Sequence, residues 1–195
     1  MKGAWLVGLV GVLALVYITM NTLRTEGVGS RGPAVGEPLP PFAAPLASLE
    51  VGDDTVANVS ARACRVRGPG ILNACALAER GPVVLAFTVP GVDRCERQVD
   101  VLARVAPRFP GVAFAAVGVR GDREELLAEQ RERGWEIPVG HDREGAVASV
   151  YAVVVCPFVT FAGGDGDVAG SSLSFLDERA LTRRVEALRG GGTLP

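Results

Sequence analysis

The sequence predicts an α/β domain with a mixed central sheet flanked by helices, preceded by one transmembrane helix. Two continuous apolar runs, at 82–87 and 112–119, are typical of strands that are covered on both faces of a sheet. Between them, apolar side chains recur at helical spacing from residue 92 to residue 107 and form one stripe. A run without any charged residue, at 3–23, has the length of a membrane span.

The length and charge of the chain limit its functions. With 195 residues it has room for one membrane segment and one domain of roughly 150 residues. The formal net charge is −2 and the basic residues form no stripe, so no nucleic acid partner is expected. The one histidine, His141, falls between a strand and Asp142, and we expect it in a solvated loop. The sequence therefore predicts no metal site and no cofactor.

The uncharged run at 3–23 predicts an N-terminal membrane anchor over residues 1–23. As a helix the run would be about 31 Å long, close to the thickness of the hydrocarbon core. A cleaved signal peptide would have a shorter apolar core and a small-x-small cleavage site, which residues 19–24 (TMNTLR) do not offer. We therefore expect a single-pass protein of the cell membrane that contacts lipid through residues 3–23. Its four cysteines are compatible with disulfides, which favours a domain on the extracytoplasmic side.

The rest of the chain divides into a tether, one domain and a tail. Residues 24–41 are rich in Gly, Pro and Ser, as in a linker without a core of its own. The domain is expected over residues 42–190, and residues 191–195 form a C-terminal tail. The first apolar stretch, at 42–50, suits an edge strand because Pro45 cannot donate to the ladder of a central one.

Turn and cap residues separate the elements expected in the second half of the domain. The expected strands cover residues 82–87, 112–119, 137–139, 158–162 and 168–175. The expected helices cover residues 92–107, 122–133 and 144–151, and the stretch between Asp177 and Gly190. The run GGDGD at 163–167 supplies a hairpin turn. This order predicts helices on both faces of the sheet.

Four local matches make the chain resemble the thioredoxin fold. They are PVVLAF at 82–87, the C-x-x-Q-x-x-x-L run from Cys95 to Leu102, PVGHDREGAVASVYAV at 138–153 and VCPFVTFAGGDGDVAG at 155–170. The resemblance extends over residues 36–190, and it is to the membrane-tethered, extracytoplasmic thiol–disulfide reductases and their peroxiredoxin relatives. It implies a thioredoxin-like domain that acts on protein thiols and disulfides or on a small thiol oxidant.

The first helix of this chain departs from both family patterns. The reductases open it with C-x-x-C, whose first cysteine attacks and whose second resolves the mixed disulfide. Here the helix begins Val92-Asp93-Arg94-Cys95, so valine replaces the attacking cysteine and the second cysteine, Cys95, remains. The peroxiredoxins place their peroxidatic cysteine at the position of Cys95, with a Thr or Ser three residues earlier. That position is again Val92, whose side chain forms no hydrogen bond.

The step from Cys156 to Pro157 offers a replacement thiol. In thioredoxin-like proteins this proline is usually cis, and the residue before it faces the active-site cysteine. If Pro157 is cis, we expect Cys156 next to Cys95, with a Cα separation below about 7 Å that allows a bridge. Cys95, beside the cation Arg94 at the start of the helix, would then attack, and Cys156 would resolve the intermediate. A purely structural disulfide and two inert thiols remain alternatives, since Cys95 also lies on the apolar stripe.

Cys64 and Cys75 precede this core, with ten residues between them. A zinc site would need further ligands at suitable spacing, and the neighbouring sequence has none. A structural disulfide across the short loop is the expectation, with a stabilisation of about 2–3 kcal/mol. Within the loop an Arg-Gly-Pro-Gly turn is followed by helical spacing from Ile71 to Ala78, so we expect a helix there.

Three functions are consistent with these residues. The first is a membrane-anchored extracytoplasmic thiol–disulfide oxidoreductase of divergent thioredoxin type that uses Cys95 and Cys156. The second is a peroxiredoxin-like peroxidase with Cys95 as the peroxidatic residue, which the missing hydroxyl at Val92 argues against. The third is a non-catalytic thioredoxin-fold binding module. We take the first as the expectation, so the chain is expected to be an enzyme.

Overall fold

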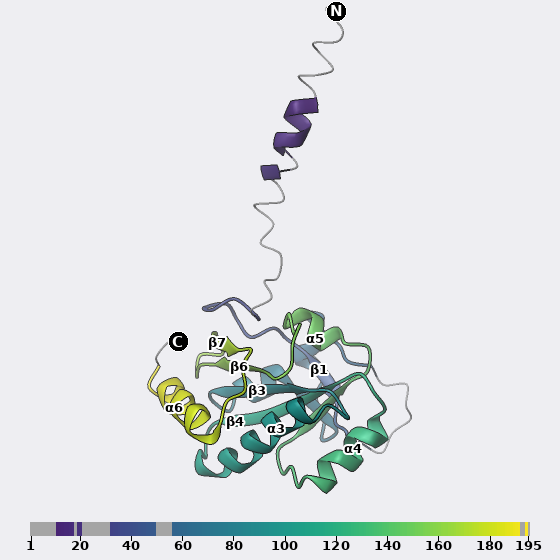
Figure 1. Ribbon diagram of the computed structural model, residues 1–195, viewed down its shortest axis with the longest axis vertical. Helices are drawn as coiled ribbons and strands as arrows, with labels where there is room; N and C mark the ends of the chain where they lie inside the picture. Colours follow the sequence, from purple (N-terminus) through teal and green to yellow (C-terminus); the bar gives the residue numbers. More distant parts are fainter. Residues whose placement is uncertain (1–10, 18, 21–31, 50–55, 192–193, 195) are drawn as a thin grey trace, which may run out of the picture.

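The computed structural model describes residues 11–17, 19–20, 32–49, 56–191 and 194. The central strands are β3 (Val83–Thr88), β4 (Ala113–Val119), β5 (Val139–Asp142), β6 (Phe158–Ala162) and β7 (Val168–Ser172). They form one five-stranded sheet in the order β5-β4-β3-β6-β7 (Figure 1). β4 runs parallel to β3 and to β5, whereas β6 is antiparallel to β3 and to β7. This is the mixed central sheet that the sequence predicts.

β3 is the middle strand of the sheet, and all six of its residues are buried. Its side chains alternate between the two faces, because Val84 belongs to one apolar cluster and Leu85 to the other. A strand that is covered on both faces needs an apolar residue at every position, which explains the continuous run in the sequence. The register places Phe87 opposite Phe158, so the start of β6 lies at the carboxyl end of β3.

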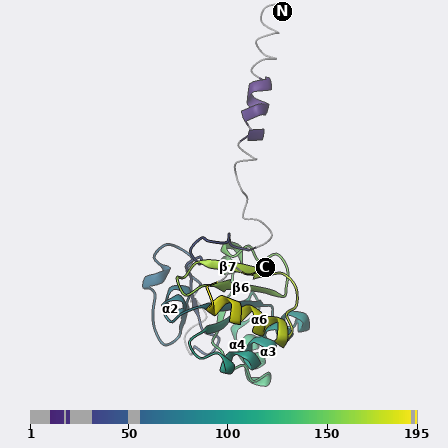
Figure 2. The same cartoon turned by 90° about the vertical axis from the view of Figure 1, so that its left-hand side faces the viewer.

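Helices cover both faces of the sheet, and in Figure 2 α3, α4 and α6 lie together below the strands. The helices are α2 (Ala74–Ala78), α3 (Asp93–Val105), α4 (Arg123–Glu132), α5 (Ala146–Val150) and α6 (Glu178–Arg189), with 3-10 turns at Ala63–Arg65 and Ala106–Arg108. α3, α4 and α6 share one apolar cluster through Leu102, Leu126 and Leu181. α2 and α5 contribute Leu77 and Val147 to the cluster on the opposite face.

A separate two-stranded sheet forms ahead of β3, where the sequence predicts one strand and one helix. β1 (Ala43–Pro45) pairs antiparallel with β2 (Ile71–Asn73), and Pro45 lies opposite Ile71. The helix expected from Ile71 to Ala78 is therefore wrong in its first part, because the backbone there pairs with β1. The helix that follows, α2, has only five residues and is capped by the side chain of Asn73.

Part of the expected tether belongs to the folded domain. The backbone nitrogen of Gly36 donates to the carbonyl of Val168, so the segment runs beside the start of β7. Leu39 is buried in the same apolar cluster as Tyr151, and the Tyr151 hydroxyl donates to the carbonyl of Pro40. These contacts begin several residues before the start expected for the domain.

Most of the expected anchor lies outside the described residues, as do residues 24–31 of the expected tether. Within residues 1–23, the structure describes 11–17 and 19–20, which are helical (Figure 1). No helix in the described part of the chain is both long and apolar enough to cross a membrane. The anchor stays a prediction from the sequence.

Candidate functional site

Cys95 lies in the first turn of α3 and faces the core. The helix begins at Asp93, with Val92 as its N-cap residue. Cys95 is 0% exposed, as is Val99 one turn later. Arg94, the expected cationic neighbour, is exposed to solvent. The sulfur of Cys95 is therefore withdrawn from solvent, because it belongs to the apolar stripe by which α3 packs on the sheet.

Cys156 comes from the loop that precedes β6. The peptide bond from Cys156 to Pro157 is cis, Pro157 is buried, and Cys156 is half-buried. Because β6 pairs with β3 and α3 follows β3 in the chain, this loop reaches the first turn of α3. A disulfide joins Cys95 to Cys156, with a Cα–Cα distance of 5.4 Å. The cis proline and the adjacency of the two cysteines agree with the sequence-based expectation, while their catalytic roles stay predictions.

Aromatic side chains support the loop that carries Cys156. The carbonyl oxygen of Phe87 lies 3.5 Å from Cys156 Sγ. The ring of Phe87 packs against Phe158 and Tyr151, with centroid distances of 5.6 Å and 5.3 Å, and Phe42 lies edge-on to Tyr151 at 5.8 Å. Burial raises the pKa of the Tyr151 hydroxyl well above its usual value. Closely packed rings of this kind fix the start of β6 relative to β3.

Three exposed valines lie within three residues of the two bridged cysteines. Val92, at the N-cap of α3, is 43% exposed, and its side chain makes no capping hydrogen bond. Val154 and Val155, which precede Cys156, are 64% and 37% exposed. At the position where the reductases that the chain resembles have their attacking cysteine, this chain therefore presents the methyl groups of Val92 to solvent.

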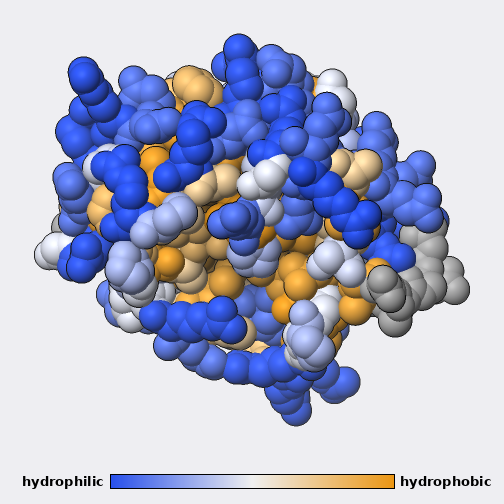
Figure 3. All heavy atoms as spheres, turned by 90° about the horizontal axis from the view of Figure 1, so that it is seen from below, coloured by the Kyte–Doolittle hydropathy of each residue, from blue (hydrophilic) through white to orange (hydrophobic). Residues whose placement is uncertain are grey.

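A cluster of charged side chains fixes the start of α3 to the end of α4. Arg133, the residue after α4, contacts Glu96 and Asp100 of α3 and Glu129 of α4. Its Nη1 lies 2.9 Å from Asp100 Oδ2, and its Nε lies 3.4 Å from Glu129 Oε1. Glu96 follows Cys95 directly, so the cluster holds the helical turn that carries the buried sulfur. Seen from below, the molecule carries hydrophilic side chains around its rim and apolar side chains between them (Figure 3).

Sequence reasoning does not identify this cluster. α4 is charged along most of its length, so Glu129 and Arg133 look like parts of a solvated face. The available signal is spacing, because Glu96 and Asp100 lie four residues apart and so do Glu129 and Arg133, which puts each pair on one helix face. Only the packing of α3 against α4 decides that these two faces meet.

Glu129 gives the domain a stability that depends on pH. Burial raises the pKa of Glu129 to about 8, together with the hydrogen bond and the negative charge of Glu96 and against the positive charge of Arg133. In the unfolded chain the same carboxyl titrates near 4.5. Between these values the folded state holds a proton that the unfolded state has lost. The free energy of unfolding therefore decreases as the pH rises from about 4.5 to about 8.

Urea unfolding at about pH 5.5 and about pH 8.5 tests this expectation. We expect a lower free energy of unfolding at the higher pH, and a smaller difference in Glu129→Gln, because an amide does not titrate. Glu132→Gln removes an exposed carboxylate from the same helix and should behave like the unsubstituted protein. The same pH dependence in both variants would contradict the assignment to Glu129.

The expectation of a solvated loop for His141 is wrong. His141 is 3% exposed and lies in β5, where it pairs with Gly118 of β4, and its Nε2 is 3.0 Å from the carbonyl oxygen of Gly121. The strand expected at 137–139 spans Val139–Asp142 instead, because pairing with β4 continues beyond the apolar residues. Among the described residues, no three His, Cys, Asp or Glu side chains are grouped as ligands for a metal ion.

The second pair of cysteines, Cys64 and Cys75, is also bridged. Their Cα–Cα distance is 5.4 Å. The bridge joins the 3-10 turn Ala63–Arg65 to the second residue of α2, and both cysteines are half-buried. The disulfide expected from the sequence is therefore present.

Three solved structures show which fold this is. A secreted Mycobacterium tuberculosis disulfide oxidoreductase homologous to E. coli DsbE is 23% identical, with 61% of this chain and 90% of that chain covered and a TM-score of 0.56. A putative thiol:disulfide interchange protein DsbE from Chlorobium tepidum is 17% identical, with 80% and 97% covered and a TM-score of 0.64. The peroxidoxin BcpB from Mycobacterium tuberculosis is 15% identical, with 80% and 96% covered and a TM-score of 0.60. No family model and no curated protein matches the chain. The domain has a thioredoxin-like fold, as the sequence predicts.

Proposed function

We propose that this chain is a membrane-anchored, extracytoplasmic thiol–disulfide oxidoreductase of divergent thioredoxin type, with Cys95 and Cys156 as its redox couple. The observation that carries the proposal is the bridge between the cis-proline loop and the first turn of α3. A thiol from this loop replaces the one that is missing at Val92. The similar disulfide oxidoreductases favour protein thiols and disulfides, or a small thiol oxidant, as substrates. The anchor and the location rest on the uncharged run at 3–23 and on the four cysteines.

The difference in burial favours Cys156 as the sulfur that exchanges with a partner. Cys95 is fully buried, whereas Cys156 is half-buried beside the exposed Val155. A partner thiolate attacks Cys156 Sγ, the bond between the two cysteines breaks, and Cys95 leaves as a thiolate. A second partner thiolate then attacks the partner sulfur of the mixed disulfide, which releases Cys156 as a thiolate and the partner as a disulfide. The reverse steps reduce a partner disulfide, with Cys156 attacking and Cys95 resolving.

This order of events exchanges the roles that the sequence suggests. A helix start and a neighbouring arginine favour a reactive thiolate at Cys95, but a nucleophile must also reach its target. Cys95 has no exposed surface in the bridged domain. The peroxidase alternative meets the same obstacle, and Val92 presents no hydroxyl to orient a peroxide.

The reduction potential of the couple tests the proposal. Measured in the Cys64→Ser/Cys75→Ser variant, where one couple titrates, it is expected to lie above about −300 mV, in the range of enzymes such as thioredoxin at about −270 mV. Alkylation and mass spectrometry give the fraction of dithiol at each ratio of oxidised to reduced thiol buffer. A potential below about −300 mV would identify a structural disulfide and overturn the proposal.

A further inference from the structure

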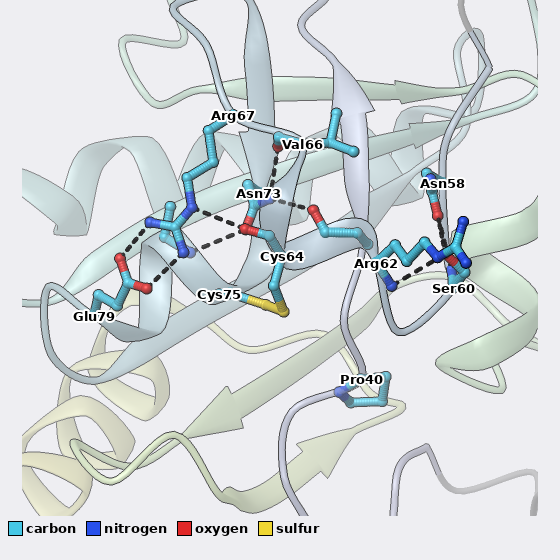
Figure 4. The surroundings of a disulfide bond; sticks show 12 residues. Pro40, Asn58, Ser60, Arg62, Cys64, Val66, Arg67, Asn73, Cys75 and Glu79 are labelled. Carbon is cyan, nitrogen blue, oxygen red and sulfur yellow. Dashed lines mark hydrogen bonds and ion pairs between the residues drawn. A yellow bond between two sulfur atoms is a disulfide. The ribbon is translucent and has the colours of Figure 1, made fainter.

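The bridge between Cys64 and Cys75 closes a loop that other contacts already hold closed (Figure 4). Asn73 is 3% exposed, and its amide nitrogen donates to the carbonyls of Ala63 and Val66, each at 2.8 Å. The oxygen of the same amide caps α2, the helix that contains Cys75. One buried side chain therefore links residues 63–67, which carry Cys64, to residues 73–79, which carry Cys75. We call these two segments the arms of the loop.

An ion pair on the surface links the two arms a second time. Arg67 Nη1 and Nη2 each lie 2.6 Å from a carboxylate oxygen of Glu79. Arg67 Nε donates to the carbonyl of Cys64 at 2.8 Å, and the backbone nitrogen of Glu79 donates to the carbonyl of Cys75 at 3.0 Å. Each end of the ion pair is thus hydrogen-bonded to one of the bridged cysteines. None of these contacts involves a sulfur atom, so all of them can persist when the disulfide opens.

The surroundings of this disulfide are accessible and cationic. Both cysteines are half-buried, and Arg62 and Arg65 beside Cys64 are exposed. Glu79 is the one acidic residue among residues 56–80, which also contain four arginines, although the formal net charge of the whole chain is −2. Exposed cations attract an anionic nucleophile and stabilise the thiolate that leaves.

We propose that Cys64 and Cys75 form a second, reversible redox site that exchanges with anionic thiols of low molecular weight while the domain stays folded. A small thiolate attacks one sulfur, forms a mixed disulfide and releases the other cysteine as a thiolate. A second small thiolate then attacks the small-thiol sulfur of that mixed disulfide, so the small thiol leaves as its own disulfide and the dithiol remains. The disulfide of the small thiol re-forms the bridge by the reverse steps, because Asn73 and Arg67 keep the two sulfurs within reach. This site is separate from Cys95 and Cys156 and does not depend on the function proposed for them.

The test uses the full chain with Cys95→Ser and Cys156→Ser, so that one couple remains. Reduced and oxidised glutathione are the anionic probes, and 2-mercaptoethanol is the uncharged one. Alkylation and mass spectrometry count free thiols, and circular dichroism follows the fold. We expect the bridge to open and re-form with an unchanged dichroism spectrum. We also expect the ratio of the opening rates with glutathione and with 2-mercaptoethanol to fall about threefold in Arg62→Gln/Arg65→Gln.

Substitutions in the linking contacts test the preorganised arms. Asn73→Ala should slow re-formation of the bridge about tenfold, because the arms lose their buried link. Arg67→Gln, on the surface, should slow it by a smaller factor without risk to the fold. Arg80→Gln, an exposed arginine outside the network, is its matched control and should leave the rate unchanged.

Three outcomes would overturn the proposal. The first is a bridge that opens only in denaturant, or only when the circular dichroism signal of the folded domain is lost, as expected of a purely structural disulfide. The second is equal re-formation rates in Arg67→Gln and Arg80→Gln. The third, a ratio of opening rates that Arg62→Gln/Arg65→Gln leaves unchanged, would overturn the choice of an anionic thiol.

Discussion

Cys95→Ser is expected to trap a partner in a mixed disulfide, whereas Cys156→Ser is expected to slow thiol–disulfide exchange about a hundredfold or more. Without Cys95, the half-buried Cys156 still reaches a partner, but no thiol remains to resolve the intermediate. Without Cys156, the remaining thiol has no exposed surface, and buried cysteines of this kind are inert. Both variants are made in the Cys64→Ser/Cys75→Ser background. An aromatic disulfide that releases a coloured thiolate measures the exchange rate, and mass spectrometry locates the adduct.

Val155→Ser is the control for this pair of variants. It changes an exposed side chain next to Cys156 and leaves both thiols in place, so the exchange rate should stay close to that of the parent. The opposite pattern, with an adduct on Cys95 in Cys156→Ser and none in Cys95→Ser, would restore the roles that the sequence suggests. If neither the parent nor any variant exchanges with the aromatic disulfide, Cys95 and Cys156 are not a catalytic couple.

Arg133→Met is expected to lower the free energy of unfolding by about 3–5 kcal/mol. The substitution removes the cation that contacts Glu96 and Asp100, whose side chains are 6% and 22% exposed. Carboxylates that lose their partner in such surroundings keep the cost of desolvation without the compensating attraction. Denaturant unfolding at neutral pH measures the loss.

Arg131→Met is the matched control for Arg133→Met. It removes the same charge from an exposed position two residues earlier, and its cost should stay within about 0.5 kcal/mol. Equal losses in the two variants would show that net charge, rather than the cluster at the start of α3, determines the effect. We also expect Arg133→Met to change the reduction potential of the Cys95–Cys156 couple, since Glu96 follows Cys95 directly.

Elements with strong local signals could be predicted from the sequence. The strand expected at 158–162 is β6 without any change, because an apolar run ends at a turn of Gly and Asp. Asp177 caps α6 by accepting a hydrogen bond from the backbone of Ala180, as its side chain and position suggest. The step from Cys156 to Pro157 is cis, and the two cysteines of the proposed couple are bridged, in agreement with the thioredoxin resemblance. The anchor, the extracytoplasmic side and the catalytic roles stay predictions.

Elements that depend on partners far away in the chain could not be predicted. Ile71–Asn73 has helical spacing, but β1 offers it a strand to pair with, and this pairing determines its conformation. His141 has a polar side chain next to an acidic residue, yet β4 continues alongside it and buries it. Tertiary pairing overrides local preference most easily in such short segments.

From the sequence alone, Cys95 and Cys156 could be proposed as a couple, because the order of residues shows where the thiols, a proline and a helix start occur along the chain. The difference between the two cysteines arises from the packing of the domain. Cys95 is buried on the core-facing side of α3, Cys156 is only half-buried, and Arg133 at the end of α4 pairs with Glu96, the residue after Cys95. Burial and long-range ion pairs arise only when separate elements pack together, so no single segment of the chain carries that information.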